Sequence, residues 1–158
     1  MTSLFNELIA LDRKSGAGGT IYLVACVAKK LDREAPAADL YQSDWFRKAR
    51  AYVRMQGEPW YILSAKHGLV APDDLVAPYE QTLNTMGAKE RRAWAKPVMR
   101  SVLQLAPAKV IILAGRKYRD DLIAPLRGEG IEVVVPMEGL GIGEQLQWLK
   151  QHGPGGTR

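Results

Sequence analysis

The sequence predicts a single-domain α/β protein, a three-layer sandwich around a mostly parallel sheet of four strands or slightly more. Four short runs are almost continuously apolar, as expected for strands that are buried on both faces. Segments with helical periodicity separate these runs, which favours parallel strands joined by helical crossovers. The chain has 158 residues, the length of one domain, and shows no internal repeat.

The two ends of the chain are expected to lie outside this domain. Three leucines repeat at helical spacing within residues 4–11, and residues 15–19 include three glycines. We therefore assign residues 1–19 to a peripheral helix with a glycine-rich linker. Residues 20–152 form the predicted α/β domain, and residues 153–158 are expected to be a disordered tail.

The predicted strands all end in small or ionisable residues. The first spans residues 21–26, and the second begins at Trp60 and stops before Gly68. The third spans residues 109–115 and the fourth residues 131–136. Because each run is apolar almost throughout, each is expected to be a buried strand of the sheet.

Helices are predicted between the strands. They span residues 44 to about 55, about 88–105 and about 118–126, and a closing helix contains Leu146 and Leu149. Ser43 is expected to cap the first of them. Residues 34–39 contain a proline and several alanines and are expected to form a loop.

Composition limits the possible functions. The chain is 47% hydrophobic and 25% charged, and its longest apolar runs are far too short to span a membrane. It begins without a cationic signal region. Its single cysteine, Cys26, excludes an internal disulfide. We therefore expect a soluble, cytoplasmic protein with no membrane partner; the oligomeric state is not indicated.

No metal or cofactor is expected. The chain has two histidines and one cysteine, too few for a structural zinc site or a histidine-rich metal site. The loop with Gly139, Gly141 and Gly143 lacks the spacing of a dinucleotide-binding fingerprint. It remains open whether this loop binds one phosphate at the start of the closing helix or is a tight turn without a ligand.

The residues that follow the strands are expected to gather at one edge of the sheet, where open α/β folds bind ligands. Most of them are cations or glycines, and the net charge of +5 also suits a phosphate-bearing partner. They are Cys26, Lys29 and Lys30 after the first strand, Ser64, Lys66, His67 and Gly68 after the second, Gly115, Arg116 and Tyr118 after the third, and Glu138, Gly139, Gly141 and Gly143 after the fourth. The alternative for the cations is an ordinary solvated loop.

Two carboxylates are the candidates for acid or base catalysis. Glu80 lies in the long irregular connection after the second strand, and Glu138 follows the fourth strand. A carboxylate above a cationic rim stays ionised and can activate water. The neighbouring Tyr79 either stacks on a base or packs under the loop.

Several motifs together resemble a functionally unassigned bacterial domain family. They are Cys-x-x-Lys-Lys at residues 26–30, Ser-Ala-Lys-His-Gly-Leu at residues 64–69, and Pro-Tyr-Glu-Gln-Thr-Leu at residues 78–83. The resemblance covers about residues 20–150. The family commonly has serine at the position of Ala28 and often tyrosine at that of His67, which implies that His67 is not an essential base.

More distantly, the chain resembles YaaA-like peroxide-stress proteins and uracil-DNA-glycosylase-like α/β folds. These relatives imply the handling of DNA or of a nucleobase. The leading hypothesis is a DNA-repair hydrolase of DNA-glycosylase type that cleaves the N-glycosidic bond of a modified or damaged base. Two alternatives stay open: a non-catalytic DNA-binding stress-protection protein, and an enzyme that acts on a free nucleotide or nucleoside.

In the leading hypothesis each group has a defined role. Lys29, Lys30 and Arg116 hold phosphates, and Tyr79 stacks the flipped base. Glu80 or Glu138 orients water or stabilises the cationic sugar. The expected partner is therefore DNA or a nucleotide, and no metal takes part.

Overall fold

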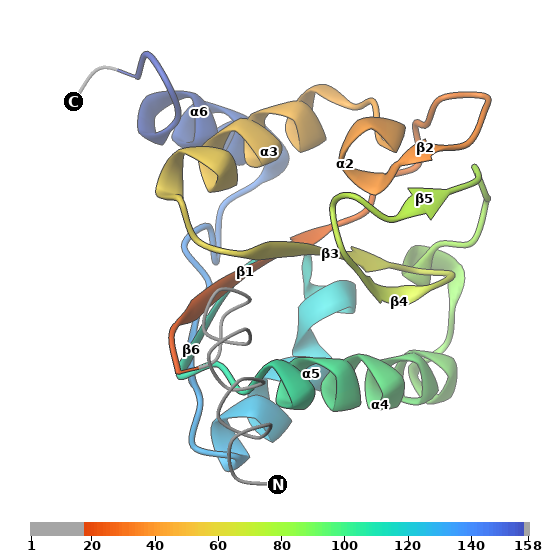
Figure 1. Ribbon diagram of the computed structural model, residues 1–158, viewed down its shortest axis with the longest axis vertical. Helices are drawn as coiled ribbons and strands as arrows, with labels where there is room; N and C mark the ends of the chain where they lie inside the picture. The colour runs from red at the N-terminus through yellow and green to blue at the C-terminus, as the bar shows by residue number, and fades with distance from the viewer. Residues whose placement is uncertain (1–17, 157–158) are drawn as a thin grey trace, which may run out of the picture.

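A five-stranded sheet in the order β4-β3-β1-β6-β7 organises the domain (Figure 1). The strands are β1 (Thr20–Ala25), β3 (Trp60–Ser64), β4 (Gly68–Val70), β6 (Lys109–Leu113) and β7 (Glu132–Val134). All pairs are parallel except β3 with β4. The computed structural model describes residues 18–156, so nearly all of the predicted N-terminal helix and linker lies outside the described residues. The mostly parallel α/β sheet is as predicted.

The edge strand β4 was not predicted from the sequence. Ala65, Lys66 and His67 form a tight turn that sends the chain back along β3, where Ser64 pairs with Gly68. Gly68 has a φ of +73°, a conformation that residues with a side chain rarely adopt. The second predicted strand is therefore the first arm of a hairpin.

Two pairs of long helices cover the sheet. Helix α3 (Asp44–Gln56) packs on α6 (Ile142–His152), and α4 (Ala88–Leu105) packs on α5 (Arg116–Gly128). Figure 1 shows the two pairs on opposite sides of the sheet. As predicted, Ser43 caps α3, because its hydroxyl accepts a hydrogen bond from the amide of Phe46 at 3.0 Å.

Residues 34–39 do not form the expected loop. They contain the short strand β2 (Ala35–Pro36), which pairs with β5 (Leu75–Val76), and the start of helix α2 (Ala37–Leu40). The prediction failed because local composition does not reveal a pairing with a strand far along the chain. At the C-terminal end, residues 153–156 contain a turn, and residues 157–158 lie outside the described part.

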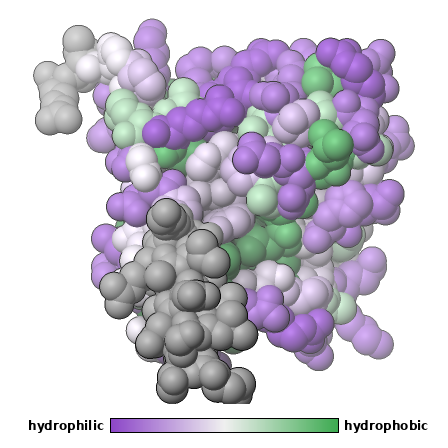
Figure 2. All heavy atoms as spheres, viewed as in Figure 1, coloured by the Kyte–Doolittle hydropathy of each residue, from purple (hydrophilic) through white to green (hydrophobic). Residues whose placement is uncertain are grey.

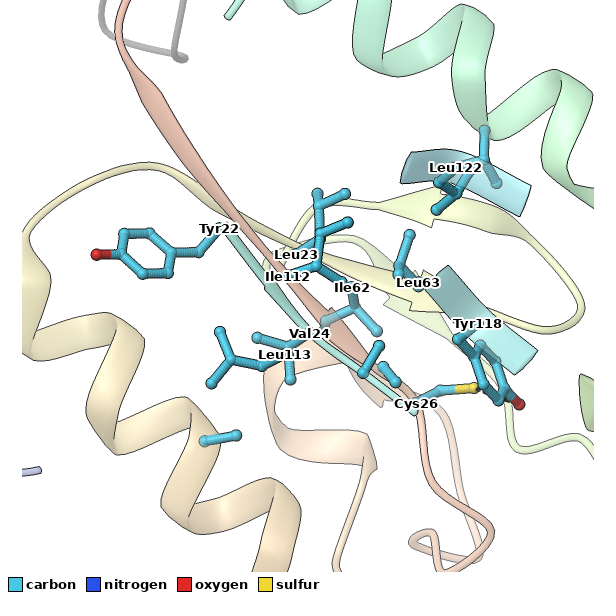
Figure 3. Packing of buried hydrophobic residues seen from close by; sticks show 14 of the residues in the cluster. Tyr22, Leu23, Val24, Cys26, Ile62, Leu63, Ile112, Leu113, Tyr118 and Leu122 are labelled. Atoms are coloured by element: carbon cyan, nitrogen blue, oxygen red, sulfur yellow. Dashed lines mark hydrogen bonds between the residues drawn. The ribbon is translucent and has the colours of Figure 1, made fainter. Parts of the chain in front are cut away.

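The core consists of apolar side chains on both faces of the central strands. The register places Leu23 opposite Ile112 and Val24 opposite Leu113. In Figure 3, Leu23 and Ile112 point to the side of the sheet on which Leu122 lies, while Val24 and Leu113 point to the other. All five side chains are fully buried. Burial on both faces explains why these strands are continuously apolar in the sequence.

The visible surface is mostly hydrophilic. Figure 2 shows the hydrophobic residues of this face in small, separate patches among hydrophilic ones. Within residues 18–156, no helix combines the length and apolar character needed to cross a membrane.

The ends of α3 and α4 allow a paired test of backbone strain. Ala106, the residue after α4, has a φ of 51°, whereas the equivalent position after α3 is Gly57 with a φ of 74°. This conformation costs a residue with a Cβ roughly 1–2 kcal/mol. We expect Ala106→Gly to raise the free energy of unfolding by about 0.5–1 kcal/mol. Urea titration measures the change.

The reverse substitution is the matched control. Gly57→Ala is expected to lower the free energy of unfolding by about 1 kcal/mol, because no other atom lies within 4 Å of the added Cβ and only the backbone strain acts. Two substitutions that shifted stability in the same direction would contradict this assignment.

Candidate functional site

A cleft of about 420 Å³ lies at the carboxyl end of β1. It is bounded by the residues after β1, by the loop that leads from β5 into η1 (Leu83–Thr85), and by the first turn of α5. Five of the residues predicted from the sequence line it: Cys26, Lys30, Tyr79, Glu80 and Tyr118. The carboxyl edge of an open α/β sheet is the position where such folds bind ligands.

The Tyr79 hydroxyl joins three segments of the chain beneath this cleft. It is 2.6 Å from the hydroxyl of Tyr41 and 2.7 Å from that of Ser64. The Ser64 hydroxyl also accepts a hydrogen bond from the amide of His67 at 3.0 Å. All three hydroxyl-bearing residues are buried, so the network fixes the β5–η1 loop against the end of β3.

Lys30 lies above this network. Its ammonium group is 4.5 Å from the centre of the Tyr79 ring and 5.8 Å from that of Tyr41, and it donates a hydrogen bond to the Ala28 carbonyl at 3.1 Å. Burial lowers the pKa of Lys30, while the neighbouring Cys26 and Glu80 side chains act in the opposite direction. The cleft therefore holds an amine beside an exposed carboxylate.

The opposite wall of the cleft is built around Tyr118. Its hydroxyl accepts hydrogen bonds from the Cys26 thiol at 3.6 Å and from the Leu83 amide at 3.2 Å. It lies 3.4 Å from the Thr82 hydroxyl. Figure 3 shows the Cys26 sulfur beside the Tyr118 ring. The thiol is buried and already has a partner, so it acts here mainly as a small structural group.

The residues of the β3–β4 turn take different positions. Ser64 is fully buried behind Tyr79, whereas Lys66 and His67 are exposed. The His67 and Tyr79 rings are in T-shaped contact, with centroids 5.6 Å apart. Gly68 makes the turn that begins β4. These residues support the cleft from behind and do not line it.

The remaining predicted residues are not brought into the cleft lining. Lys29 is exposed, and Arg116 is exposed with an ion pair to Asp120 at 3.4 Å. Gly115 precedes α5 as its N-cap. The residues after β7 also lie outside the lining: Glu138, Gly139, Gly141 and Gly143 are exposed in or beside the turn that leads into α6. Of the two predicted carboxylates, only Glu80 faces the cleft.

Five further lining residues were not predicted as site residues from the sequence. They are Val27, Ala28, Gln81, Thr82 and Asn84. Gln81 and Thr82 belong to the Pro-Tyr-Glu-Gln-Thr-Leu motif, so the motif itself contained the signal. Asn84 is held next to α5, because its carbonyl accepts a hydrogen bond from Lys117 at 2.9 Å. The two amide side chains add both donors and acceptors to the cleft.

The described residues 18–156 contain no group of three or more histidine, cysteine or acidic side chains arranged to hold a metal ion. The cleft lining brings together an amine, a carboxylate, two carboxamides, a thiol and the hydroxyl-bearing residues Tyr79, Thr82 and Tyr118. Such a set can hydrogen-bond a polar ligand and transfer protons.

Comparison with known proteins places the chain in a family. The model of a family of unknown function, DUF6884, matches residues 21–151. The chain belongs to this family. A further similar protein is the uncharacterized protein YfjM of Bacillus subtilis (strain 168), which is 33% identical over 143 residues that cover 82% of this chain and 91% of YfjM. DUF6884 membership agrees with the expected functionally unassigned bacterial domain family.

One solved structure shares the fold. It is described as the crystal structure of AF0587, a protein of unknown function, and it matches with a TM-score of 0.54 at 19% identity. The match covers 98% of this DUF6884 chain but 51% of AF0587, so the chain spans about half the length of that protein. At this identity the likeness concerns the fold alone.

The Tyr79 hydroxyl can be tested by removing it. Tyr79→Phe removes the hydroxyl partner of both Tyr41 and Ser64, and leaves the Ser64 hydroxyl only the hydrogen bond from the His67 amide. We expect the free energy of unfolding to fall by about 1–3 kcal/mol. Urea titration measures the loss. If the hydroxyl network stabilises the DUF6884 fold, Ser64→Ala must also lower the free energy of unfolding. The double variant must then lose less free energy of unfolding than the sum of the two single losses.

The buried phenols also predict a loss of stability at alkaline pH. Burial raises the pKa of Tyr41 and that of Tyr118 from the ordinary 10.0 to about 12. The folded protein therefore keeps protons that the unfolded chain loses, so this stabilisation is complete below pH 10 and declines as the pH rises towards 12. We expect unfolding free energies measured across this range to fall less steeply for Tyr118→Phe. An unchanged slope would contradict the assignment.

Proposed function

We propose that this protein is a cytoplasmic hydrolase of DNA-glycosylase type, which cleaves the N-glycosidic bond of a modified or damaged base on a three-layer α/β sandwich. One observation carries the proposal: the cleft at the end of β1 holds the Glu80 carboxylate together with the Lys30 amine and the carboxamides of Gln81 and Asn84. Its volume of about 420 Å³ lies within the range of small-ligand sites. A single flipped nucleoside has dimensions suited to it.

Glu80 supplies the central chemistry. When the N-glycosidic bond breaks, its electron pair leaves with the base and the sugar becomes cationic. The Glu80 carboxylate stabilises this charge and takes a proton from the water that adds to the anomeric carbon. The departing base takes up a proton from solvent, and the products are the neutral base and the sugar hemiacetal. Glu80 is exposed at the cleft and is outside every ion pair formed by the described residues, so it is free to approach a substrate.

The other lining groups orient the substrate. The carboxamides of Gln81 and Asn84 offer donors and acceptors for the polar edge of a base. Val27 and the Tyr118 ring supply apolar contacts. Tyr79 has a different role from the predicted stacking, since its ring is buried and Lys30 lies over it. In this proposal Tyr79 supports Lys30.

Cations outside the cleft support binding to a nucleic-acid backbone. Lys29, Arg116 and Lys117 are exposed near the ends of β1 and β6. Contacts from such side chains to phosphates bind DNA without sequence preference and weaken as salt increases. The net charge of +5 acts in the same direction. The lining supplies the base contacts, and these cations supply the backbone contacts.

A free nucleoside or nucleotide is the second candidate substrate. The size of the cleft favours it, because a volume of about 420 Å³ suits one nucleoside without any flanking strand. The chemistry at Glu80 is the same for both substrates. The two proposals differ only in whether the exposed cations contribute to substrate binding.

The test is release of a free base by the purified protein. The substrates are duplex oligonucleotides that each carry one modified base, such as uracil, hypoxanthine or an oxidised guanine, and the matching free deoxynucleosides. We expect Glu80→Gln to lower the rate by about 100-fold or more, the usual size of a general acid or base contribution. Chromatography of the released base measures the rate.

Two further variants sharpen this experiment. Glu90→Gln, an exposed carboxylate in the first turn of α4, is the matched control and is expected to keep the wild-type rate. Glu138→Gln tests the other predicted carboxylate and is expected to reduce the rate less than Glu80→Gln, because Glu138 does not line the cleft. DNA binding without release of any base, unchanged by Glu80→Gln, would favour a non-catalytic DNA-binding protein instead.

A further inference from the structure

Lys30 is held on a fixed segment of backbone. It forms a β-bridge with Tyr41. On either side of it, the Leu31 amide donates to the Leu40 carbonyl at 2.9 Å, and the Gln42 amide donates to the Lys29 carbonyl at 2.8 Å. A side chain carried by such a segment starts from a defined point, unlike a lysine on a loose loop.

The amine end of Lys30 is held as well. The contacts that hold it are the Ala28 carbonyl and the faces of two tyrosine rings. Among residues 18–156, no carboxylate forms a salt bridge with it. Lysines that only add positive charge to a surface are usually more exposed than this side chain, which is partly buried in the cleft wall.

The surroundings of Lys30 favour the neutral amine more than water does. Four titratable groups face it: Glu80 and Cys26 in the cleft, and the buried phenols of Tyr79 and Tyr41. Burial is the strongest influence and lowers the pKa of Lys30. A lysine acts as a nucleophile only when its amine is neutral, so that the nitrogen lone pair is free. Partial burial increases the fraction of the lysine that is in this neutral form.

We propose that Lys30 is an amine nucleophile, which forms an imine with the sugar aldehyde left at an abasic site. This inference rests on the proposed function, since release of a base leaves a deoxyribose whose open form carries an aldehyde at the anomeric carbon. The substrate class of the second step is therefore an aldehyde sugar in DNA. Lys30 lines the same cleft as Glu80, so both steps use one site.

The step balances without an oxidant or reductant. The nitrogen lone pair of neutral Lys30 attacks the aldehyde carbon, and the carbonyl oxygen takes up a proton, giving a carbinolamine. Glu80, in the same cleft, transfers protons between nitrogen and oxygen. The hydroxyl leaves as water, and a carbon–nitrogen double bond forms. Hydrolysis reverses the step and frees the lysine.

Reductive trapping tests this proposal. The probe is a duplex oligonucleotide in which an abasic site has been generated beforehand, mixed with the full-length protein and sodium borohydride. Borohydride donates hydride to the imine and converts it into a stable secondary amine that joins the protein to the DNA. We expect a covalent complex on a denaturing gel, with the modified peptide containing Lys30 by mass spectrometry.

The decisive variant is Lys30→Arg. It keeps the positive charge, but a guanidinium does not deprotonate in proteins and forms no imine. We expect the covalent complex to be lost, while the affinity for abasic DNA stays within a few-fold of wild type. The matched control is Lys89→Arg, which changes an exposed lysine at the start of α4 and is expected to leave trapping unchanged.

Three results would overturn the inference: no trapped complex with the wild-type protein, equal trapping by Lys30→Arg, or attachment at another amine. The design separates this failure from failure of the proposed function, because the abasic site is made before the protein is added. Base release without trapping would contradict only the proposal that Lys30 forms an imine. Trapping without base release would support Lys30 as an aldehyde-reactive amine and contradict the proposed hydrolase activity.

Discussion

The arrangement of the cleft depends on the hydrogen bonds of one buried hydroxyl, that of Tyr79. It is hydrogen-bonded to the hydroxyl of Ser64, at the carboxyl end of β3, and to that of Tyr41, which follows α2. Three separate segments of the chain are thereby joined at one buried point. Burial raises the pKa of Tyr79 well above its ordinary value, so the group remains a neutral phenol and can both donate and accept. This junction fixes the Tyr79 end of the β5–η1 loop relative to the sheet.

This anchor explains why an exposed residue can have a defined position. Tyr79 is buried, Glu80 and Gln81 are exposed, Thr82 is half-buried, and Leu83 is again fully buried. The loop is thus held at both ends, by the Tyr79 hydroxyl at one end and by Leu83 at the other. The Leu83 side chain is buried, and its backbone amide donates a hydrogen bond to the Tyr118 hydroxyl. The residues between them line the cleft. Preorganisation of this kind is what a catalytic carboxylate requires.

The sequence predicted the sheet well because its strands are buried on both faces, and short apolar runs such as residues 109–113 are typical of strands in that position. It predicted the site less completely. The four predicted strands are parallel and do end at one edge, as expected. The order β4-β3-β1-β6-β7, however, separates β7 from β1 by β6. Neighbouring strands lie about 4.8 Å apart, so the residues after β7 begin two strands from the cleft. Strand order is a long-range property that no local pattern encodes.

The pair Lys29 and Lys30 shows the same limit at the scale of single residues. The two lysines are identical and adjacent, and composition assigns both to a phosphate site. The β-bridge to Tyr41 gives them different surroundings, since Lys30 lies over the tyrosine rings at the cleft while Lys29 is left in solvent. A solvated ammonium can serve only as a charge, whereas a partly desolvated one is also closer to being a free amine. Because the pairing partner of Lys30 lies eleven residues along the chain, its chemistry is set by tertiary structure and not by the basic motif in which it occurs.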